Sequence, residues 1–287
     1  MNTSRTRAAI WALRLGWVAL GVLGWSAVAD AVEGRSGPVG AVATGLAIAI
    51  WAGGVIGLAI PAVTTLVVLR VVAPLVPVGL IIAWRYGAEP ASVGPALPIA
   101  LAVVALAANA TLGGVYVQAS AYGHEQRFAL QPPPAYLLAA ILAWLLAAAG
   151  LFAGPLLLAA GVWAAGVPLT VLIGVGVFAW PRWLRLAQRW LVVVPAGLVV
   201  HDPLVLAETL MLRRVDVARV RLAPADSEAA DLTGPAAGHA LEILTTGSVS
   251  AIYAATPDRP TGTAIHLSAL LVAPTRPGRA LAAATAT

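Results

Sequence analysis

Few residues of this 287-residue chain carry groups that could do chemistry. It has no Cys, four His and only 12 Asp and Glu. His201 and Asp202 stand side by side and could serve as a metal-ligating or catalytic pair. Such a site needs further ligands, and neither His239 nor His266 has a helpful spacing. We interpret the pair as a strand end that enters a turn, and we expect no catalytic, metal-binding or cofactor-binding residues.

A basic cluster between residues 213 and 221 could bind an anion. Each arginine near an anionic membrane surface contributes about 1 kcal/mol of binding. Neighbouring acids, including Asp216, partly offset the charge, so a solvated face explains the cluster equally well. The candidate contacts for a partner or a lipid are Arg213, Arg214, Arg219 and Arg221.

The segment Gln118–Pro134 concentrates polar and aromatic side chains between two long apolar stretches. Its three final prolines stop a helix and favour an extended chain. We expect either a docking surface for the C-terminal region or a partner, or a solvated connector, and the sequence leaves both open. The candidate contact residues are Tyr122, His124, Glu125 and Arg127.

Arg70 is the one charged residue between Val39 and Trp84. A charged side chain inside a membrane segment is costly and often functional. A long arginine side chain can also extend to the membrane surface from near a helix end. Arg70 is therefore a candidate intramembrane functional residue, with a structural role near the end of its span as the alternative.

Composition explains why so few such residues exist. Hydrophobic residues make up 60% of the chain, charged residues 10%, and the mean hydropathy is +0.90. Soluble domains carry about 25% charged residues, so a lipid-facing surface is expected. All 17 basic residues are arginines, which together with many Ala, Gly, Pro and Val residues is typical of a high-GC bacterial genome. The arginines sit mainly at the ends of apolar stretches, so no nucleic-acid partner is expected.

The sequence predicts two domains that meet near Pro181. Residues 1–181 hold 11 charged residues and residues 182–287 hold 18. The first domain is predicted to be a multi-pass α-helical membrane bundle, in which Pro61 separates the second span from the third. Its six expected spans are residues 8–29, 38–60, 63–84, 95–117, 136–153 and 155–180.

Arginines near the span ends predict the orientation. With the N-terminus inside, eight arginines of the first 189 residues lie on the cytoplasmic side and two on the other. The positive-inside rule then places both termini in the cytoplasm, with the chain in a bacterial inner membrane. Cleavage after Ala27-Val28-Ala29, which resembles a signal-peptidase site, would leave five spans and the same location for the C-terminal region.

Residues 182–287 are predicted to form a β-rich cytoplasmic domain. Trp190–Val194 and Leu198–Asp202 alternate as strands around Pro195-Ala196-Gly197, which suits a three-residue hairpin with a glycine bulge. Residues 275–284 could form a closing helix. Together these elements describe a small, partly open barrel. The other expected strands are residues 207–212, 218–223, 240–245, 250–254 and 263–272.

This order resembles the bacterial PH-like domains found at the inner end of membrane helices. The residues that carry the resemblance are Trp190–Asp202, Val215–Val220 and Ala273–Gly278. Together with the Ser120–Glu125 segment, they make most of the chain similar to multi-pass membrane proteins of high-GC bacteria with a C-terminal PH-like domain. The resemblance implies a PH-like fold and no particular activity, since PH-like folds elsewhere bind either lipid head groups or peptides.

Three functions remain open from the sequence. The first is a non-enzymatic scaffold or regulator whose cytoplasmic domain binds a protein partner or inner-leaflet lipid. The second is a transporter or channel with Arg70 as an anion contact, although no span holds an acid or a His near its middle. The third is an intramembrane enzyme that processes lipid, for which no paired carboxylates, Ser–His arrangement or nucleotide-binding loop is found.

Overall fold

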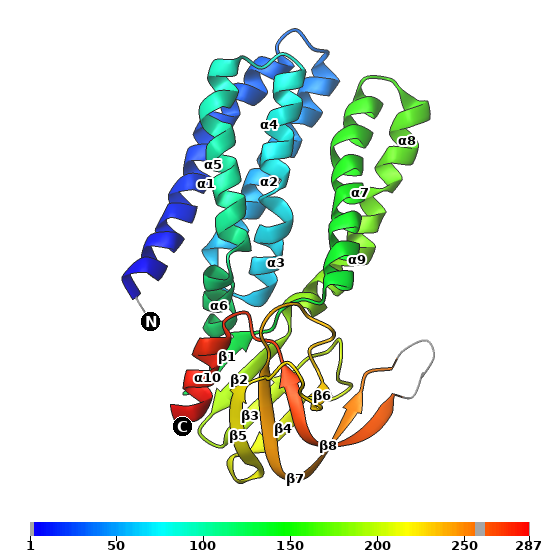
Figure 1. The fold of residues 1–287 in the computed structure, drawn as a ribbon. Coiled ribbons are helices and arrows are strands. Elements are labelled where there is room, and N and C mark those ends of the chain that lie inside the picture. Colours follow the sequence, from blue (N-terminus) through cyan, green and yellow to red (C-terminus); the bar gives the residue numbers. More distant parts are fainter. Residues whose placement is uncertain (1–2, 256–261, 287) are drawn as a thin grey trace. The chain divides into compact units, whose positions relative to one another are not determined.

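The computed structural model describes residues 3–255 and 262–286, and the chain divides into two compact units (Figure 1). The bundle unit comprises Met1–Gly113 and Ala140–Pro181, and the sheet unit comprises Gly114–Ala139 and Arg182–Thr287. The sheet unit thus contains the Gln118–Pro134 segment, which the sequence predicts as part of the membrane domain.

Six helical stretches of the described chain are long and apolar enough to cross a membrane, as expected of a multi-pass membrane protein. They are Thr6–Val32, Gly37–Ala59, Val63–Arg85, Pro90–Ala108, Pro134–Ala159 and Trp163–Ala187. The individual helices are α1 (Thr3–Val32), α2 (Gly37–Ala59), α3 (Val63–Val72), α4 (Leu75–Arg85), α5 (Pro90–Ala108), α6 (Ala110–Ala119), α7 (Pro134–Ala159), α8 (Trp163–Val171) and α9 (Ile173–Ala187). The expected break at Pro61 is confirmed, since α2 ends at Ala59 and α3 begins at Val63.

The fourth span is shorter at its C-terminal end than predicted. Helix α5 ends at Ala108, and Asn109 adopts an extended conformation before α6 begins. The Asn109 side-chain oxygen accepts a hydrogen bond from the Thr111 backbone N–H at 2.7 Å. This is the interaction by which asparagine starts a helix, so the apolar run predicted as one span is two helices.

The boundary between the fifth and sixth spans also differs from the prediction. Pro155 lies inside α7, and the chain turns at Gly161, which has φ +78°. The Val162 N–H bonds to the Leu157 carbonyl and the Gly161 N–H to the Leu158 carbonyl, the pattern of a glycine-terminated helix. Glycine adopts this left-handed conformation without steric cost, so it ends α7 where Pro155 does not.

Close helix packing in the bundle unit depends on aromatic residues and glycine. Trp17 of α1 and Trp51 of α2 each donate an indole N–H to the other's backbone carbonyl, at 3.0 and 3.3 Å. The Trp17 ring lies directly against Gly54 of α2, where any side chain would collide with it. Elsewhere in the unit, Phe152 of α7 packs with Leu75 of α4.

The sheet unit contains two four-stranded sheets. The first has the order β1-β2-β3-β4 and is fully antiparallel, while the second has the order β5-β7-β8-β6, in which only β6 runs parallel to its neighbour. The strands are β1 (Gln126–Ala129), β2 (Trp190–Val194), β3 (Gly197–His201), β4 (Leu210–Arg213), β5 (Val217–Leu222), β6 (Ala230–Asp231), β7 (Leu241–Tyr253) and β8 (Thr263–Val272).

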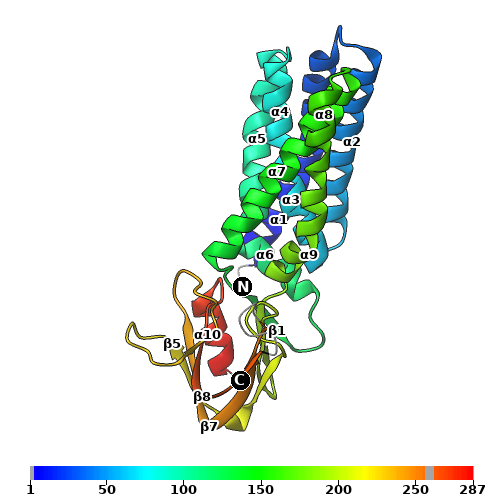
Figure 2. The ribbon, with the colours of Figure 1, turned by 90° about the vertical axis from the view of Figure 1, so that its right-hand side faces the viewer.

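The predicted closing helix is confirmed as α10 (Pro277–Ala286), which lies between the two sheets in Figure 2. Its Ala280 and Ala284 belong to the same apolar core as Leu191 of the first sheet and Leu270 of the second. The prediction of a barrel is met only in part, because the strands form two separate sheets and close no barrel.

Candidate functional site

The β2–β3 hairpin sets the geometry of the candidate site. Val194 pairs with Gly197, so the connection is the two residues Pro195 and Ala196 rather than the three predicted. Gly197 has φ +150°, and a side chain there would collide with the Leu212 carbonyl of β4. The requirement for glycine thus comes from the close approach of β4, and the hairpin register opposes Trp190 to His201.

Strand β1 joins the segment between the fourth and fifth spans to this hairpin. Gln126 to Ala129 pair with Val193 to Trp190 in antiparallel register. The pairing continues beyond the strand, where the Leu130 N–H bonds to the Arg189 carbonyl at 3.0 Å and the Gln131 N–H to the Ala273 carbonyl at 2.7 Å. Residues 126–131 of the Gln118–Pro134 segment are thus paired with the C-terminal region.

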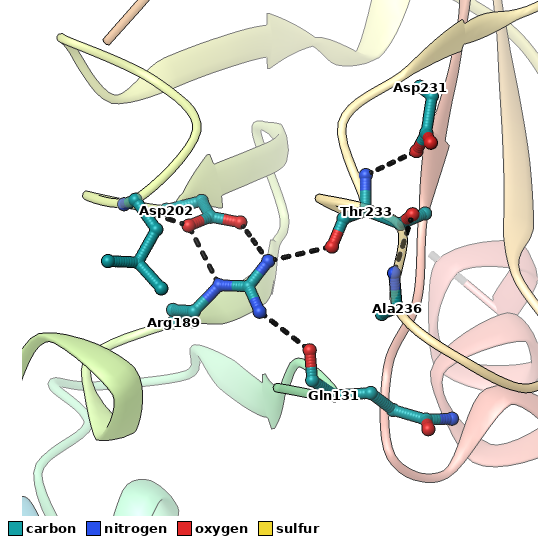
Figure 3. A network of polar contacts seen from close by, with 7 residues as sticks. Gln131, Arg189, Asp202, Asp231, Thr233 and Ala236 are labelled. Atoms are coloured by element: carbon teal, nitrogen blue, oxygen red, sulfur yellow. Dashed lines mark hydrogen bonds and ion pairs between the residues drawn. The ribbon is translucent and has the colours of Figure 1, made fainter. Parts of the chain in front are cut away.

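A buried ion pair lies at the end of the hairpin, on its core side (Figure 3). Arg189 Nε and Nη2 donate to the two carboxylate oxygens of Asp202 at 2.8 and 2.7 Å, and both side chains are completely buried. Nη1 donates to the Gln131 carbonyl at 2.6 Å, and Nη2 also donates to the Thr233 carbonyl at 2.9 Å. Asp202 accepts a third bond from the Leu204 backbone N–H.

This network connects segments that are far apart in the sequence. Gln131 comes three residues before α7, Arg189 two residues after α9, and Thr233 follows β6. A buried charge without a partner costs several kcal/mol, so the network stabilises one arrangement of these segments. The Asp202 carboxylate is therefore bound by Arg189. In residues 3–255 and 262–286, no group of three or more His, Asp or Glu side chains is arranged to hold a metal.

An aromatic stack covers the outer face of the same hairpin. The rings of Trp190 and His201 lie 4.9 Å apart at an interplanar angle of 25°. The Arg127 guanidinium of β1 lies 5.3 Å from the Trp190 ring centre, within cation–π range. His201 Nδ1 is 2.9 Å from the Thr209 hydroxyl. Exposed Met211 of β4 shares this face, because it pairs with Val199, two residues before His201.

Burial lowers the pKa of His201 below the ordinary 6.5, with Asp202 opposing the shift and Arg127 adding to it. Burial therefore favours the neutral form of the imidazole. The pKa of Glu125 is also lowered, first by the hydrogen bond from the Tyr122 backbone N–H and then by Arg127, while burial opposes the shift. Arg127 thus contributes to the lowered pKa of both residues.

The predicted contact residues of this loop have different surroundings. Glu125 pairs with Arg127 at 2.7 Å, and its carboxylate also accepts the Tyr122 N–H at 2.6 Å. Tyr122 is 84% exposed, and His124 is exposed in the same turn. The structure thus brings Glu125 and Arg127 together within the fold and leaves Tyr122 and His124 at the surface.

The predicted basic cluster is divided between elements, and three of its four members have internal partners. Arg213 pairs with Asp216 at 2.7 Å, which raises the pKa of the arginine and lowers that of the acid. Arg221 of β5 pairs with Glu242, whose pKa is lowered first by the Ser227 hydroxyl and then by this arginine. Arg214 donates to the Ala284 carbonyl of α10, and Arg219 is exposed on β5.

Arg70 of α3 contacts the end of another helix. Its Nε donates to the Ala107 carbonyl in the last turn of α5 at 3.2 Å, and its Nη2 lies against Gly113 of α6. Arg14 of α1 likewise donates to the Leu58 carbonyl near the end of α2 at 3.4 Å. The last carbonyls of a helix lack partners within it and carry partial negative charge. Both arginines therefore cap helix C-termini.

The comparisons offer no relative to extend this description. No family model matches the chain, and neither a curated protein nor a solved structure matches it.

Proposed function

We propose that this chain is a non-enzymatic scaffold or regulator of a bacterial inner membrane, with a cytoplasmic PH-like sheet unit that binds a protein partner. The observation that supports the proposal best is that two separate parts of the chain, Gly114–Ala139 and Arg182–Thr287, form the sheet unit together. Strand β1 and the Arg189 network hold the segments next to α7 and α9 in one fold. A partner bound to the sheet unit would thereby act on both helices.

Two further observations support this proposal. Two sheets with a helix packed into their common core fit the PH-like resemblance, and Arg213 and Arg221 already have carboxylate partners, which favours a protein over a lipid at that surface. In the bundle unit, the carbonyl partners of Arg14 and Arg70 give these arginines a structural role, so no observation favours the transport alternative.

The proposal is tested in cells with the full-length chain. A photo-crosslinking residue at exposed Met211, on the outer face of the first sheet, is expected to capture one discrete protein. The same residue at exposed Ser248 of the β7–β8 hairpin serves as the control position. Capture should disappear in an Asp202→Ala variant present at the same membrane level, because the buried network supports the first sheet.

A deletion tests the same proposal from the opposite direction. A chain that ends at Arg185 lacks β2, the strand with which β1 pairs. This shortened chain should fail to restore wild-type behaviour to a deletion strain. Full activity of that shortened chain would contradict the proposal and move attention to the bundle unit.

A further inference from the structure

Two arginines lie at the start of α10, and the described residues offer neither of them an ion-pair partner. Arg276 immediately precedes the helix and Arg279 lies in its first turn. Burial and the charge of Arg279 lower the pKa of Arg276. A helix N-terminus is also its positive end, so the fold places two cations where the local field opposes them.

The position of these arginines within the sheet unit is fixed by backbone hydrogen bonds. The Thr275 N–H bonds to the Ala129 carbonyl at 2.8 Å, and Pro274 forms a bridge with Leu130. Only three residues separate Leu130 from the start of α7 at Pro134. Arg276 therefore lies at the end of the sheet unit from which α7 leaves.

Helix α9 joins the sheet unit at the same end. Its last residue, Ala187, comes two residues before Arg189, whose carbonyl accepts the Leu130 N–H. The last two turns of α9 carry exposed Arg182 and Arg185. Arginines thus lie on each of the segments next to the points where α7 and α9 join the sheet unit, and the nearby Asp202 at the end of the hairpin is bound by Arg189.

We propose that Arg276 and Arg279 bind the phosphate of anionic lipid head groups in the membrane that α7 and α9 enter. Guanidinium groups match the geometry of phosphate oxygens, and an anionic surface would relieve the repulsion between the two arginines. This site goes beyond the proposed partner binding, because it concerns the lipid that the unit contacts whichever protein it binds. It also differs from the predicted lipid cluster, in which Arg213 and Arg221 have carboxylate partners.

The absence of Cys makes a direct test possible. Gly278 is exposed, and a side chain at this position would meet nothing within 4 Å, so Gly278→Cys provides one labelling site beside both arginines. The full-length chain, labelled there with an environment-sensitive dye, is reconstituted in phosphatidylcholine nanodiscs with increasing phosphatidylglycerol. The dye signal is expected to change with the anionic lipid and to saturate.

Substitutions then identify the residues responsible. Arg279→Gln should raise the phosphatidylglycerol fraction at half-saturation about fivefold, and the double variant with Arg276→Gln should abolish the response. Arg279→Lys should keep most of it, because the charge remains. Glu228→Gln, which removes one exposed charge elsewhere in the sheet unit, should leave the response unchanged. Unaltered amide-exchange protection of α10 shows that each variant retains its fold.

Three results would overturn the proposal. The first is an undiminished response to phosphatidylglycerol in the folded double variant. The second is an equal response to soluble inorganic phosphate in neutral nanodiscs, which would identify a free anion rather than a lipid as the ligand. The third is a response to an acidic peptide but not to phosphatidylglycerol, which would identify a protein partner.

Discussion

Removing one side of the buried ion pair should have a much larger effect than any surface change in the sheet unit. In Asp202→Ala, the Arg189 guanidinium keeps the carbonyls of Gln131 and Thr233 but loses both charge-assisted bonds. Both side chains are completely buried, so water cannot replace the carboxylate. Breaking a buried pair in this way typically costs about 3–5 kcal/mol.

Amide hydrogen exchange of the full-length protein in detergent measures this cost locally. If β2 and β3 exchange by opening of the sheet unit, the expected loss raises their exchange rates by roughly two to more than three orders of magnitude. The matched control is Asp216→Ala, which breaks the exposed pair with Arg213, whose side chain is 73% exposed. Solvent and salt screen such a pair, so the control should exchange like the parent protein.

A double substitution tests the physical reason for the loss. In Arg189→Met with Asp202→Leu, no charge remains buried, so protection should recover in part from the level of Asp202→Ala. Recovery should be incomplete, because the carbonyls of Gln131 and Thr233 have lost their donor. If Asp202→Ala exchanges like the parent protein, or the double variant is no better than the single one, the network does not stabilise the unit as argued.

Three further predictions concern other parts of the chain. Gly54→Ala should lower the free energy of unfolding of the detergent-solubilised protein by about 1–3 kcal/mol, because the added side chain would collide with Trp17. A side chain at Gly45 in the same helix would meet nothing within 4 Å, so Gly45→Ala should cause no such loss. Equal losses in the two variants would refute the packing argument. Because the pKa of His201 is lowered in the folded state, the unfolded state takes up a proton more readily than the folded state, and stability should fall as the pH drops below 6.5 towards the folded-state pKa. His201→Gln should weaken the pH dependence of the amide-exchange rates across that interval. An unchanged pH dependence in the variant would assign the effect to another group. Arg70→Gln should speed amide exchange at the end of α5 through loss of the capping bond, and unchanged exchange there would show that the cap contributes nothing.

The sequence predicts those features of the fold that follow from local composition. Six apolar runs predict six helices, and the alternation around Pro195 predicts a hairpin. Errors arose where one residue outweighs the average character of its neighbours. The predicted helix boundary at Pro155 is wrong, because α7 continues past this residue and ends where Gly161 adopts a left-handed conformation. Asn109 likewise divides one apolar run into two helices, and a single polar residue in such a run does not predict a break.

The candidate site was missed because it depends on register and on distant segments. A three-residue connection between β2 and β3 would oppose Asp202 to Trp190, whereas the observed two-residue connection brings Asp202 opposite Arg189. Arg189 itself was interpreted only as a span-end arginine. Strand β1 is four residues long, and its partner lies more than 60 residues further along the chain, so local periodicity could not reveal the pairing.

Strand β1 belongs to the same sheet as the C-terminal strands β2, β3 and β4. Cysteine pairs introduced into the otherwise cysteine-free chain test it most directly in native membranes. Arg127→Cys with Val192→Cys places two thiols at directly paired positions, whereas Arg127→Cys with Val199→Cys separates them by two strand spacings, roughly 9–10 Å, which is beyond disulfide reach. We expect rapid crosslinking of the first pair under mild oxidation and none of the second. No crosslink in the first pair, or equal crosslinking of both, would contradict it.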